Sequence, residues 1–231
     1  MFIVVTAVRY WFSSNRRMFH IAIDEPAQLA VARFVAGGTR WNLFDHSTWR
    51  PGMGTLMAPI FWFTDDYATI MHAGLLMEAA LGGAATVVLV LLARRLTSLS
   101  PSACVGASLL IGLAPASLSA TAYVWAEGLV TLTFLGALYF TIDYFDTDRR
   151  WAGSAAIVTS VAGLVAHGRL IPLVVLVTLV VVGRSLGRRH WRRALFHLVV
   201  AAGSAVLGSA YTAWIFSRVW DETGSSNTIG T

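Results

Sequence analysis

Residues 96–126 read LTSLSPSACVGASLLIGLAPASLSATAYVWA, and no charged side chain occurs between Arg95 and Glu127. A second uncharged stretch, ALFHLVVAAGSAVLGSAYTAWIFS, covers residues 194–217. A run of about 18 or more apolar residues is typical of a transmembrane helix, because about 20 helical residues cross the hydrocarbon core of a bilayer. The two stretches therefore predict an all-α, multi-pass transmembrane helical bundle.

The composition of the whole chain supports this fold class. Its 231 residues are 56% hydrophobic and 13% charged, whereas about 25% of the residues in soluble domains are charged. All 17 basic residues are arginines, and many of them lie beside apolar segments. Arginines in such positions indicate how the protein is oriented in the membrane, so the net charge of +5 does not predict a nucleic-acid partner. The single cysteine, Cys104, lies in an apolar run and is expected to be a packing residue.

Hydropathy and charge predict where the chain crosses the membrane. We expect spans over residues 69–93, 102–122, 125–145, 151–166, 170–183 and 194–217. The connections 94–95, 146–150 and 184–193 hold nine arginines, and the opposite short turns and the tail hold two. The positive-inside rule then places residues 14–68 and the tail on the extracytoplasmic face of the plasma membrane.

The predicted organisation has four parts: a partial first transmembrane helix at 1–13, an extracytoplasmic loop at 14–68, the transmembrane bundle at 69–217, and a disordered tail at 218–231. The first 12 residues are about half the length of a span, so a short interfacial helix is an equal alternative. Within the loop, residues 25–36 and 53–63 are expected to form short amphipathic helices in the membrane interface.

Carboxylates at the extracytoplasmic side are the first candidates for chemistry. Asp24 and Glu25 are adjacent, and such a pair can provide a general base and a neighbour that orients a substrate. The alternative is that one of them caps the helix that Pro26 opens. Glu127 lies at the outer end of a predicted span, where it either binds substrate or is a solvated helix end. Glu78 interrupts a span, which predicts a polar partner or a cavity.

A turn with two basic side chains is the second candidate. His167, Gly168 and Arg169 separate helices that are slightly short for two full spans, so we expect the turn to lie below the outer membrane surface. An arginine at that depth needs an anion, and its planar guanidinium suits phosphate. The alternative is that Arg169 reaches the lipid headgroups. His46 and Arg50 in the outer loop are further candidates for substrate contact.

Two other acidic pairs are not predicted to carry chemistry. The sequence Asp146-Thr147-Asp148 resembles a metal-binding motif, but it lies in a short connection beside arginines and is expected to be a solvated turn. The pair Asp65-Asp66 precedes a span and is expected to cap it. No metal site is predicted from these residues.

The order of these features resembles the N-terminal portion of the GT-C superfamily of membrane glycosyltransferases, which includes protein O-mannosyltransferases and aminoarabinose transferases. The acidic pair lies in IDEPAQLAVARFVAGG, and a Pro-containing apolar segment follows in WRPGMGTLMAPIF. A Glu at the start of a span occurs in YVWAEGLV, and an Arg that opens a span occurs in AHGRLIPLVVL. The resemblance extends over most of residues 15–185, and each of these motifs is short.

The resemblance implies inverting transfer of a sugar from a polyprenyl-phosphate donor to a lipid, polysaccharide or protein acceptor on the outer face. It implies that Asp24 is the base and that Arg169, with His167, stabilises the lipid phosphate. Glu25 and Glu127 would hold sugar or acceptor hydroxyls. No cofactor is implied with certainty, and a divalent metal is left open.

A non-catalytic membrane protein that binds a phosphate-bearing lipid, as a carrier or an assembly partner, is the alternative to the enzyme. It would use the spans and Arg169 but would not need Asp24. Members of the resembled superfamily are commonly much longer than this chain. We therefore expect a truncated or split enzyme whose C-terminal half is a further partner.

The predicted topology can be tested with single cysteines in a Cys104→Ala background. We expect an impermeant thiol reagent added to intact cells to label Ser47→Cys but not Gly187→Cys, because nine arginines hold the second position inside. Permeabilised cells, in which both positions should react, are the control. Labelling at position 187 without labelling at position 47 would contradict the topology.

Overall fold

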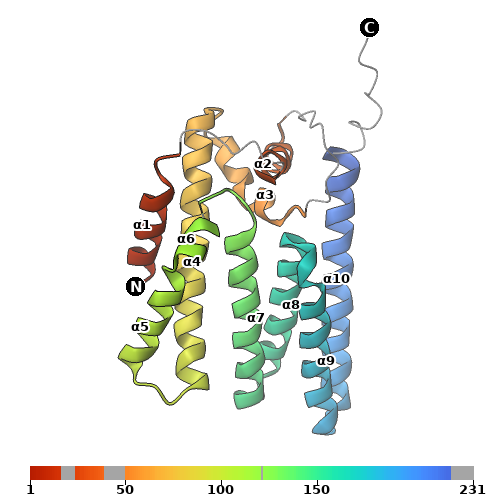
Figure 1. The fold of residues 1–231 in the computed structure, drawn as a ribbon. Coiled ribbons are helices and arrows are strands. Elements are labelled where there is room, and N and C mark those ends of the chain that lie inside the picture. The colour runs from red at the N-terminus through yellow and green to blue at the C-terminus, as the bar shows by residue number, and fades with distance from the viewer. Residues whose placement is uncertain (17–23, 39–49, 121, 220–231) are drawn as a thin grey trace.

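The computed structural model describes residues 1–16, 24–38, 50–120 and 122–219, and the described part of the chain contains helices and no strand (Figure 1). In chain order the elements are α1 (Phe2–Ser13), α2 (Asp24–Val35), α3 (Gly52–Met57), η1 (Ala58–Trp62), α4 (Tyr67–Leu96), α5 (Pro101–Gly112), α6 (Pro115–Ala120), α7 (Glu127–Thr147), α8 (Arg150–Ala166), η2 (Gly168–Leu170), α9 (Ile171–Gly187) and α10 (Trp191–Val219). Helices α4, α7, α9 with η2, and α10 are long and apolar enough to cross a membrane. The predicted all-α membrane bundle is confirmed.

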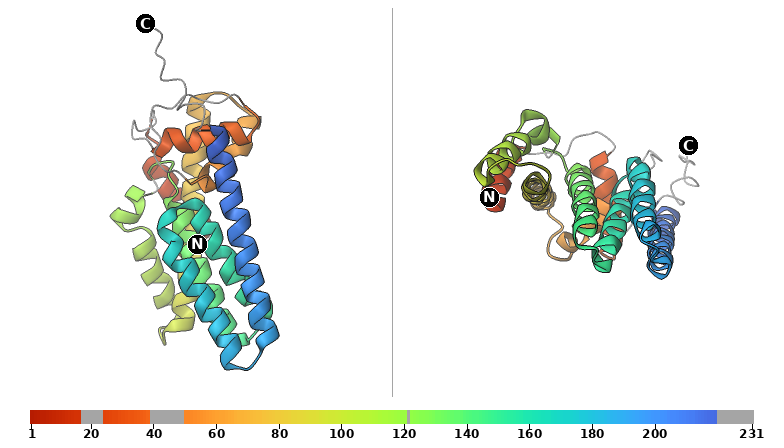
Figure 2. Two further views of the ribbon diagram at one scale, coloured as in Figure 1. Left: turned by 90° about the vertical axis from the view of Figure 1, so that its right-hand side faces the viewer. Right: turned by 90° about the horizontal axis from the view of Figure 1, so that it is seen from below.

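The long helices lie side by side with their axes roughly aligned: α7, α8, α9 and α10 alternate in direction, whereas α4 and α7 run the same way (Figure 1). Helix α8 packs against α7, α9 and α10, and α10 also packs against α9; α4 packs against α7 with α1 and α5 on its other side (Figure 1). Helix α2 lies across the long helices at one end (Figure 2). We call this end the loop end, and we call the opposite end, which carries residues 184–193, the arginine end.

Five of the six predicted spans correspond to single helices, and the prediction for 102–122 is wrong. Helix α5 ends at Gly112, and the separate helix α6 begins at Pro115. Proline has no backbone N–H and disfavours helical backbone in the residue before it, so the chain cannot continue as one helix. The Arg9 guanidinium donates to the Gly112 carbonyl at 2.6 Å and to the Ser117 carbonyl at 3.3 Å.

Helix α1 is a packed part of the bundle although its 12 residues are too few to cross a bilayer. It runs beside α4, where two glycines leave room for its side chains (Figure 1). A Cβ at Gly82 would collide with the Arg9 guanidinium, and a Cβ at Gly83 would collide with the Thr6 hydroxyl. This close packing leaves Arg9 only 5% exposed.

The two predicted amphipathic segments form α2 and the pair α3–η1. Helix α2 is buried on more than one face: Leu29 and Ala32 belong to the main core, whereas Ala30 packs with Ile215 and Val219 of α10. We expected a helix in the membrane interface with one buried face. The structure instead places α2 between α3 and the loop end of α10, so much of its surface contacts protein.

Acidic side chains stabilise the two ends of the long helices. Asp66 caps α4 as predicted, because its carboxylate accepts a hydrogen bond from the Thr69 backbone N–H at 2.8 Å. Hydrogen bonds from the Thr69 hydroxyl and backbone hold the pKa of Asp66 below its usual value. At the arginine end, Asp148 is more than the expected solvated turn, since it pairs with Arg193 at 2.9 Å and with Arg188 at 3.4 Å.

The contact between α2 and α3 can be tested at Gly54, where a Cβ would meet the Gln28 carbonyl oxygen at 2.6 Å. We expect Gly54→Ala to lower the free energy of unfolding by about 1–3 kcal/mol, as is typical of overpacking, measured by thermal unfolding in detergent. Gly203→Ala is the control because no atom lies within 4 Å of that Cβ, and it should be neutral or slightly stabilising. Equal stability of both variants would contradict the close contact.

Candidate functional site

Glu25 joins the start of α2 to the turn that precedes α7. Its side chain is fully buried, and it forms a salt bridge with Arg16 at 2.8 Å. Its Oε1 also accepts a hydrogen bond from the Val124 backbone N–H at 2.7 Å. Arg16 in turn donates to the Ala122 carbonyl at 2.6 Å and lies over the ring of Tyr123. Glu25 therefore links the start of α2 to the segment that precedes α7.

Glu78 has the polar partner that its position inside a predicted span led us to expect. The residue is completely buried in α4, and its Oε2 accepts a hydrogen bond from the Gly128 backbone N–H at 2.9 Å. Helix α7 has Ala126 at its N-cap and receives no side-chain cap of its own. The first turn of a helix leaves N–H groups without acceptors, and Glu78 supplies one from a neighbouring helix.

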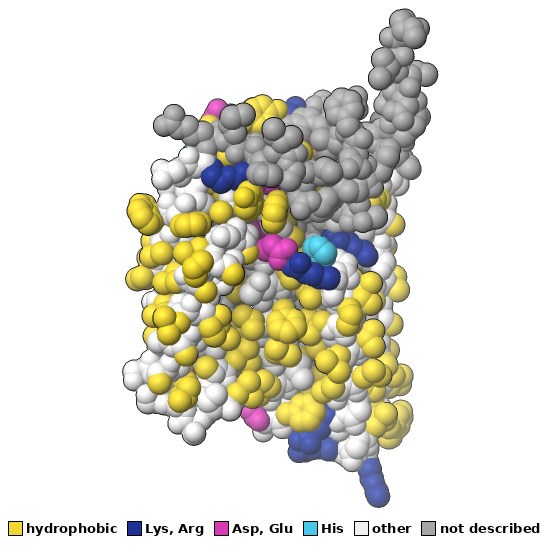
Figure 3. All heavy atoms as spheres, viewed as in Figure 1, with side chains coloured by type: hydrophobic (Ala, Val, Ile, Leu, Met, Phe, Trp, Pro, Cys, Tyr) yellow, Lys and Arg dark blue, Asp and Glu magenta, His cyan; other side chains and the backbone are white. Residues whose placement is uncertain are grey.

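Four of the predicted site residues meet where α7 begins. Arg169 forms an ion pair with Glu127, although the two residues are 42 positions apart in the sequence. The His167 Nδ1 accepts a hydrogen bond from the Arg169 backbone N–H at 3.1 Å. Arg50 lies beside Gly168, because a Cβ at that glycine would be 3.6 Å from Arg50 Nε. Acidic, basic and histidine side chains meet in the corresponding part of the loop end in Figure 3.

The α8–α9 turn that carries Arg169 ends short of the level that α4 and α10 reach at the loop end (Figure 1). The turn is therefore recessed relative to these two helices. The cost of placing a guanidinium there is offset by the Glu127 carboxylate, and both side chains stay partly exposed, at 47% and 29%. Arg169 has five N–H donors, so further donors remain for a second anion.

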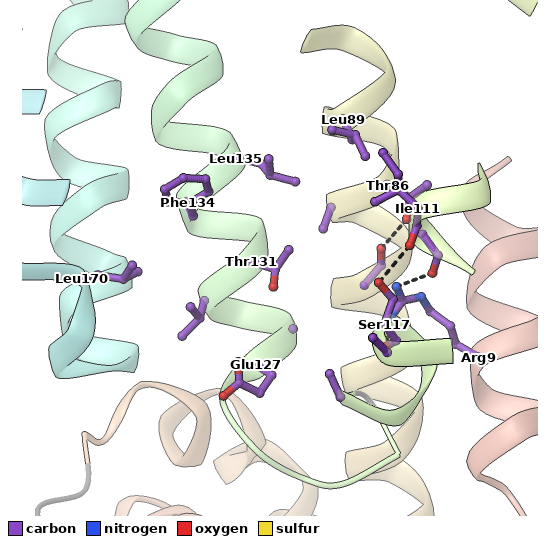
Figure 4. A pocket seen from close by; sticks show the side chains of 17 residues that line it. Arg9, Thr86, Leu89, Ile111, Ser117, Glu127, Thr131, Phe134, Leu135 and Leu170 are labelled. Carbon is purple, nitrogen blue, oxygen red and sulfur yellow. Dashed lines mark hydrogen bonds between the residues drawn. The ribbon is translucent and has the colours of Figure 1, made fainter. Parts of the chain in front are cut away.

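An apolar groove of about 530 Å³ begins beside this ion pair and runs between α4, α5 and α7. Figure 4 shows Glu127 at one end of the groove and Leu89 and Leu135 at the other, with Thr131 and Phe134 between them. Leu170, which follows Arg169, also lines the groove. The arrangement therefore offers a charged head region and an adjoining apolar channel, as a lipid with a polar headgroup requires.

The remaining predicted residues are placed only in part. Asp24 is the first residue of α2, next to Glu25, and its side chain lies outside the described part of the structure, as does His46. Within the described residues, no three His, Cys, Asp or Glu side chains are grouped so that they could hold a metal ion. Glu25 bonds to Val124, and Arg169 pairs with Glu127 three residues further along the same segment.

Sequence reasoning missed two residues that organise this region. Gln28 accepts a hydrogen bond from the Gly54 backbone N–H at 2.8 Å, and its amide donates to the Arg50 carbonyl at 3.4 Å. Arg16 neutralises the buried Glu25. Gln28 could have been noticed in the sequence, because it is a polar residue on an otherwise apolar face of residues 25–36. Arg16 carried no distinguishing pattern.

The linking role of Glu25 predicts a graded effect on stability. We expect Glu25→Leu to lower the free energy of unfolding by about 2–3 kcal/mol, because it leaves Arg16 without its carboxylate and Val124 without an acceptor. Glu25→Gln keeps an acceptor oxygen and should cost less. Asp65→Asn removes an exposed carboxylate and is the control. Thermal unfolding in detergent measures the stability of the three variants. An unfolding midpoint unchanged by Glu25→Leu would contradict the linking role of Glu25.

The chain matches no protein-family model, and no curated protein or solved structure matches it. The resemblance to GT-C glycosyltransferases therefore stays a prediction from the sequence motifs. The function is inferred from the residues and the groove at the loop end.

Proposed function

We propose that this protein transfers a sugar, with inversion, from a polyprenyl-phosphate donor to an acceptor at the extracytoplasmic face of the plasma membrane. The observation that carries this proposal is the Glu127–Arg169 ion pair at the head of an apolar groove. A polyprenyl phosphate combines an anionic head with a long apolar chain. The guanidinium suits the phosphate, and the groove suits the beginning of the chain.

The reaction assigns one role to each residue. The acceptor hydroxyl oxygen attacks the anomeric carbon, and the bond from that carbon to the phosphate oxygen breaks. The Asp24 carboxylate takes the hydroxyl proton as general base. The electron pair of the broken bond stays on the polyprenyl phosphate, and Arg169, with His167 beside it, stabilises that negative charge.

The remaining carboxylates differ in their availability to a substrate. Glu127 is partly exposed at the mouth of the groove and can accept hydrogen bonds from sugar hydroxyls. Glu25 is fully buried against Arg16 and Val124. A direct contact between Glu25 and a sugar would require those bonds to break, so we assign Glu25 the positioning of its neighbour Asp24.

A non-catalytic lipid carrier is the second candidate, because the groove and the ion pair would serve it equally well. Such a protein binds the phosphate lipid through Arg169 and has no use for a base. The two functions therefore differ at Asp24, and both depend on Arg169.

Sugar transfer from a radiolabelled polyprenyl-phosphate sugar, assayed in membranes of cells that express the protein, separates the two. We expect Asp24→Asn to reduce transfer roughly 100- to 10,000-fold, because it removes the general base, while lipid binding persists. Asparagine is a good helix cap, so a capping role alone predicts little change. Asp65→Asn is the control at the same end. Full transfer by Asp24→Asn would remove the base assignment.

The same membranes test the phosphate site. Arg169→Ala should weaken binding of the polyprenyl phosphate roughly 10- to 100-fold, since hydrogen bonds to charged groups are worth about 1.5–3 kcal/mol. Arg218→Ala, at the loop end of α10, is the matched control. Unchanged binding by Arg169→Ala would contradict both the enzyme and the carrier.

A further inference from the structure

A second cavity lies at the arginine end, far along the bundle from the Glu127–Arg169 pair. It has a volume of about 420 Å³ and is formed by the α9–α10 turn and the start of α8. Its lining residues are basic or aromatic: Arg150, Arg189, His190, Trp191, Arg192 and Arg193. No acidic side chain lines it, so the cavity is a region of positive potential.

The described carboxylates of this end pair with only one arginine of the cavity lining, Arg193. Asp148 is shared by Arg188 and Arg193, and the other two acidic residues of this end, Asp143 and Asp146, pair with Arg95. Among the described residues, three arginines of the lining form no ion pair: Arg150, Arg189 and Arg192. Like charges at short range repel, and a bound anion relieves that repulsion.

Two of these unpaired arginines are held in place by aromatic rings. The Arg150 guanidinium lies 3.4 Å from the ring centroid of Phe196, and the Arg192 guanidinium lies 5.3 Å from that of Trp191. Stacking on a ring restrains a guanidinium and leaves its edge free to donate. Helix α10 begins at Trp191, and the N–H groups of its first turn add to the positive potential.

The cavity adjoins an apolar outer surface. Trp191 is 62% exposed, and Leu186 and Leu195, on the flanking helices, are 55% and 54% exposed. In a membrane-spanning bundle such side chains face lipid, and exposed tryptophan is typical of the boundary between the hydrocarbon core and the headgroups. A ligand at this depth can therefore have a charged part in the cavity and an apolar part beside these leucines.

We propose that this cavity binds the phosphate headgroup of an anionic phospholipid from the leaflet at the arginine end. Basic pockets between transmembrane helices at this level are suited to such headgroups, and the charge and the adjoining apolar surface both favour a lipid over a soluble ion. The site is independent of the proposed sugar transfer, because it shares no residue with the groove at the loop end.

The proposal is tested with the purified full chain in a neutral detergent, titrated with fluorescent phosphatidylglycerol. We expect saturable binding that phosphatidylcholine does not displace. The double variant Arg189→Gln/Arg192→Gln should weaken binding about tenfold or more, because it removes two unpaired cations from the site. The matched control Arg94→Gln/Arg149→Gln removes the same charge from the same end and should change binding less than about threefold.

Competition distinguishes the source of the phosphate. Inorganic phosphate should fail to displace the fluorescent lipid at equal concentration, and displacement there would overturn the assignment to a lipid. Equal weakening by the two double variants would also overturn the proposal, since it would indicate a diffuse surface effect. If the Arg189→Gln/Arg192→Gln variant does not fold, the native protein is crosslinked with a photoreactive phosphatidylglycerol instead. Crosslinks within 189–193 support the site, and crosslinks confined to other segments overturn it.

Discussion

Between the end of α5 at Gly112 and the start of α7 at Glu127 the described residues hold only the short helix α6, and the rest of the loop end depends on how the polar backbone groups of this connection are satisfied. Backbone N–H and C=O groups without partners are expensive in a membrane-embedded bundle. Charged side chains from distant parts of the chain supply these partners: Arg9 and Arg16 donate to its carbonyls, and Glu25 and Glu78 accept from its N–H groups. The start of α7, and with it Glu127, is fixed by these bonds.

Hydropathy predicted most of the helices because the length of an apolar run is a local property of the sequence. The break between α5 and α6 was missed, although Gly112 and Pro115 are visible in the run, because apolarity continues across them. The partners in 112–128 could not be predicted in the same way. They join residues that are about 50 to 100 positions apart, such as Glu78 with Gly128 and Glu25 with Val124, and no periodicity reports such a pairing.

The residues of the candidate site were predicted one by one, and the contacts between them were not. An arginine in a recessed turn was expected to need an anion, and Glu127 was singled out for other reasons, but nothing in the sequence paired them. The burial of α2 was underestimated for a different reason. Alanines such as Ala27, Ala30 and Ala32 contribute little to an apolar pattern, yet small side chains let helices approach closely. The sequence therefore indicated one apolar face, where the structure buries several.

The two proposed phosphate sites differ in whether the arginines that would hold the phosphate have a carboxylate partner, and this bears on what each site can bind. At the loop end Arg16 and Arg169 are each matched by a carboxylate. Under the proposed function, a phosphate at Arg169 would share that cation with Glu127, which would limit the affinity and favour release of the lipid after transfer. At the arginine end, Arg189 and Arg192 face no such competitor among the described residues. An exchangeable ligand suits the first arrangement, and a resident lipid suits the second.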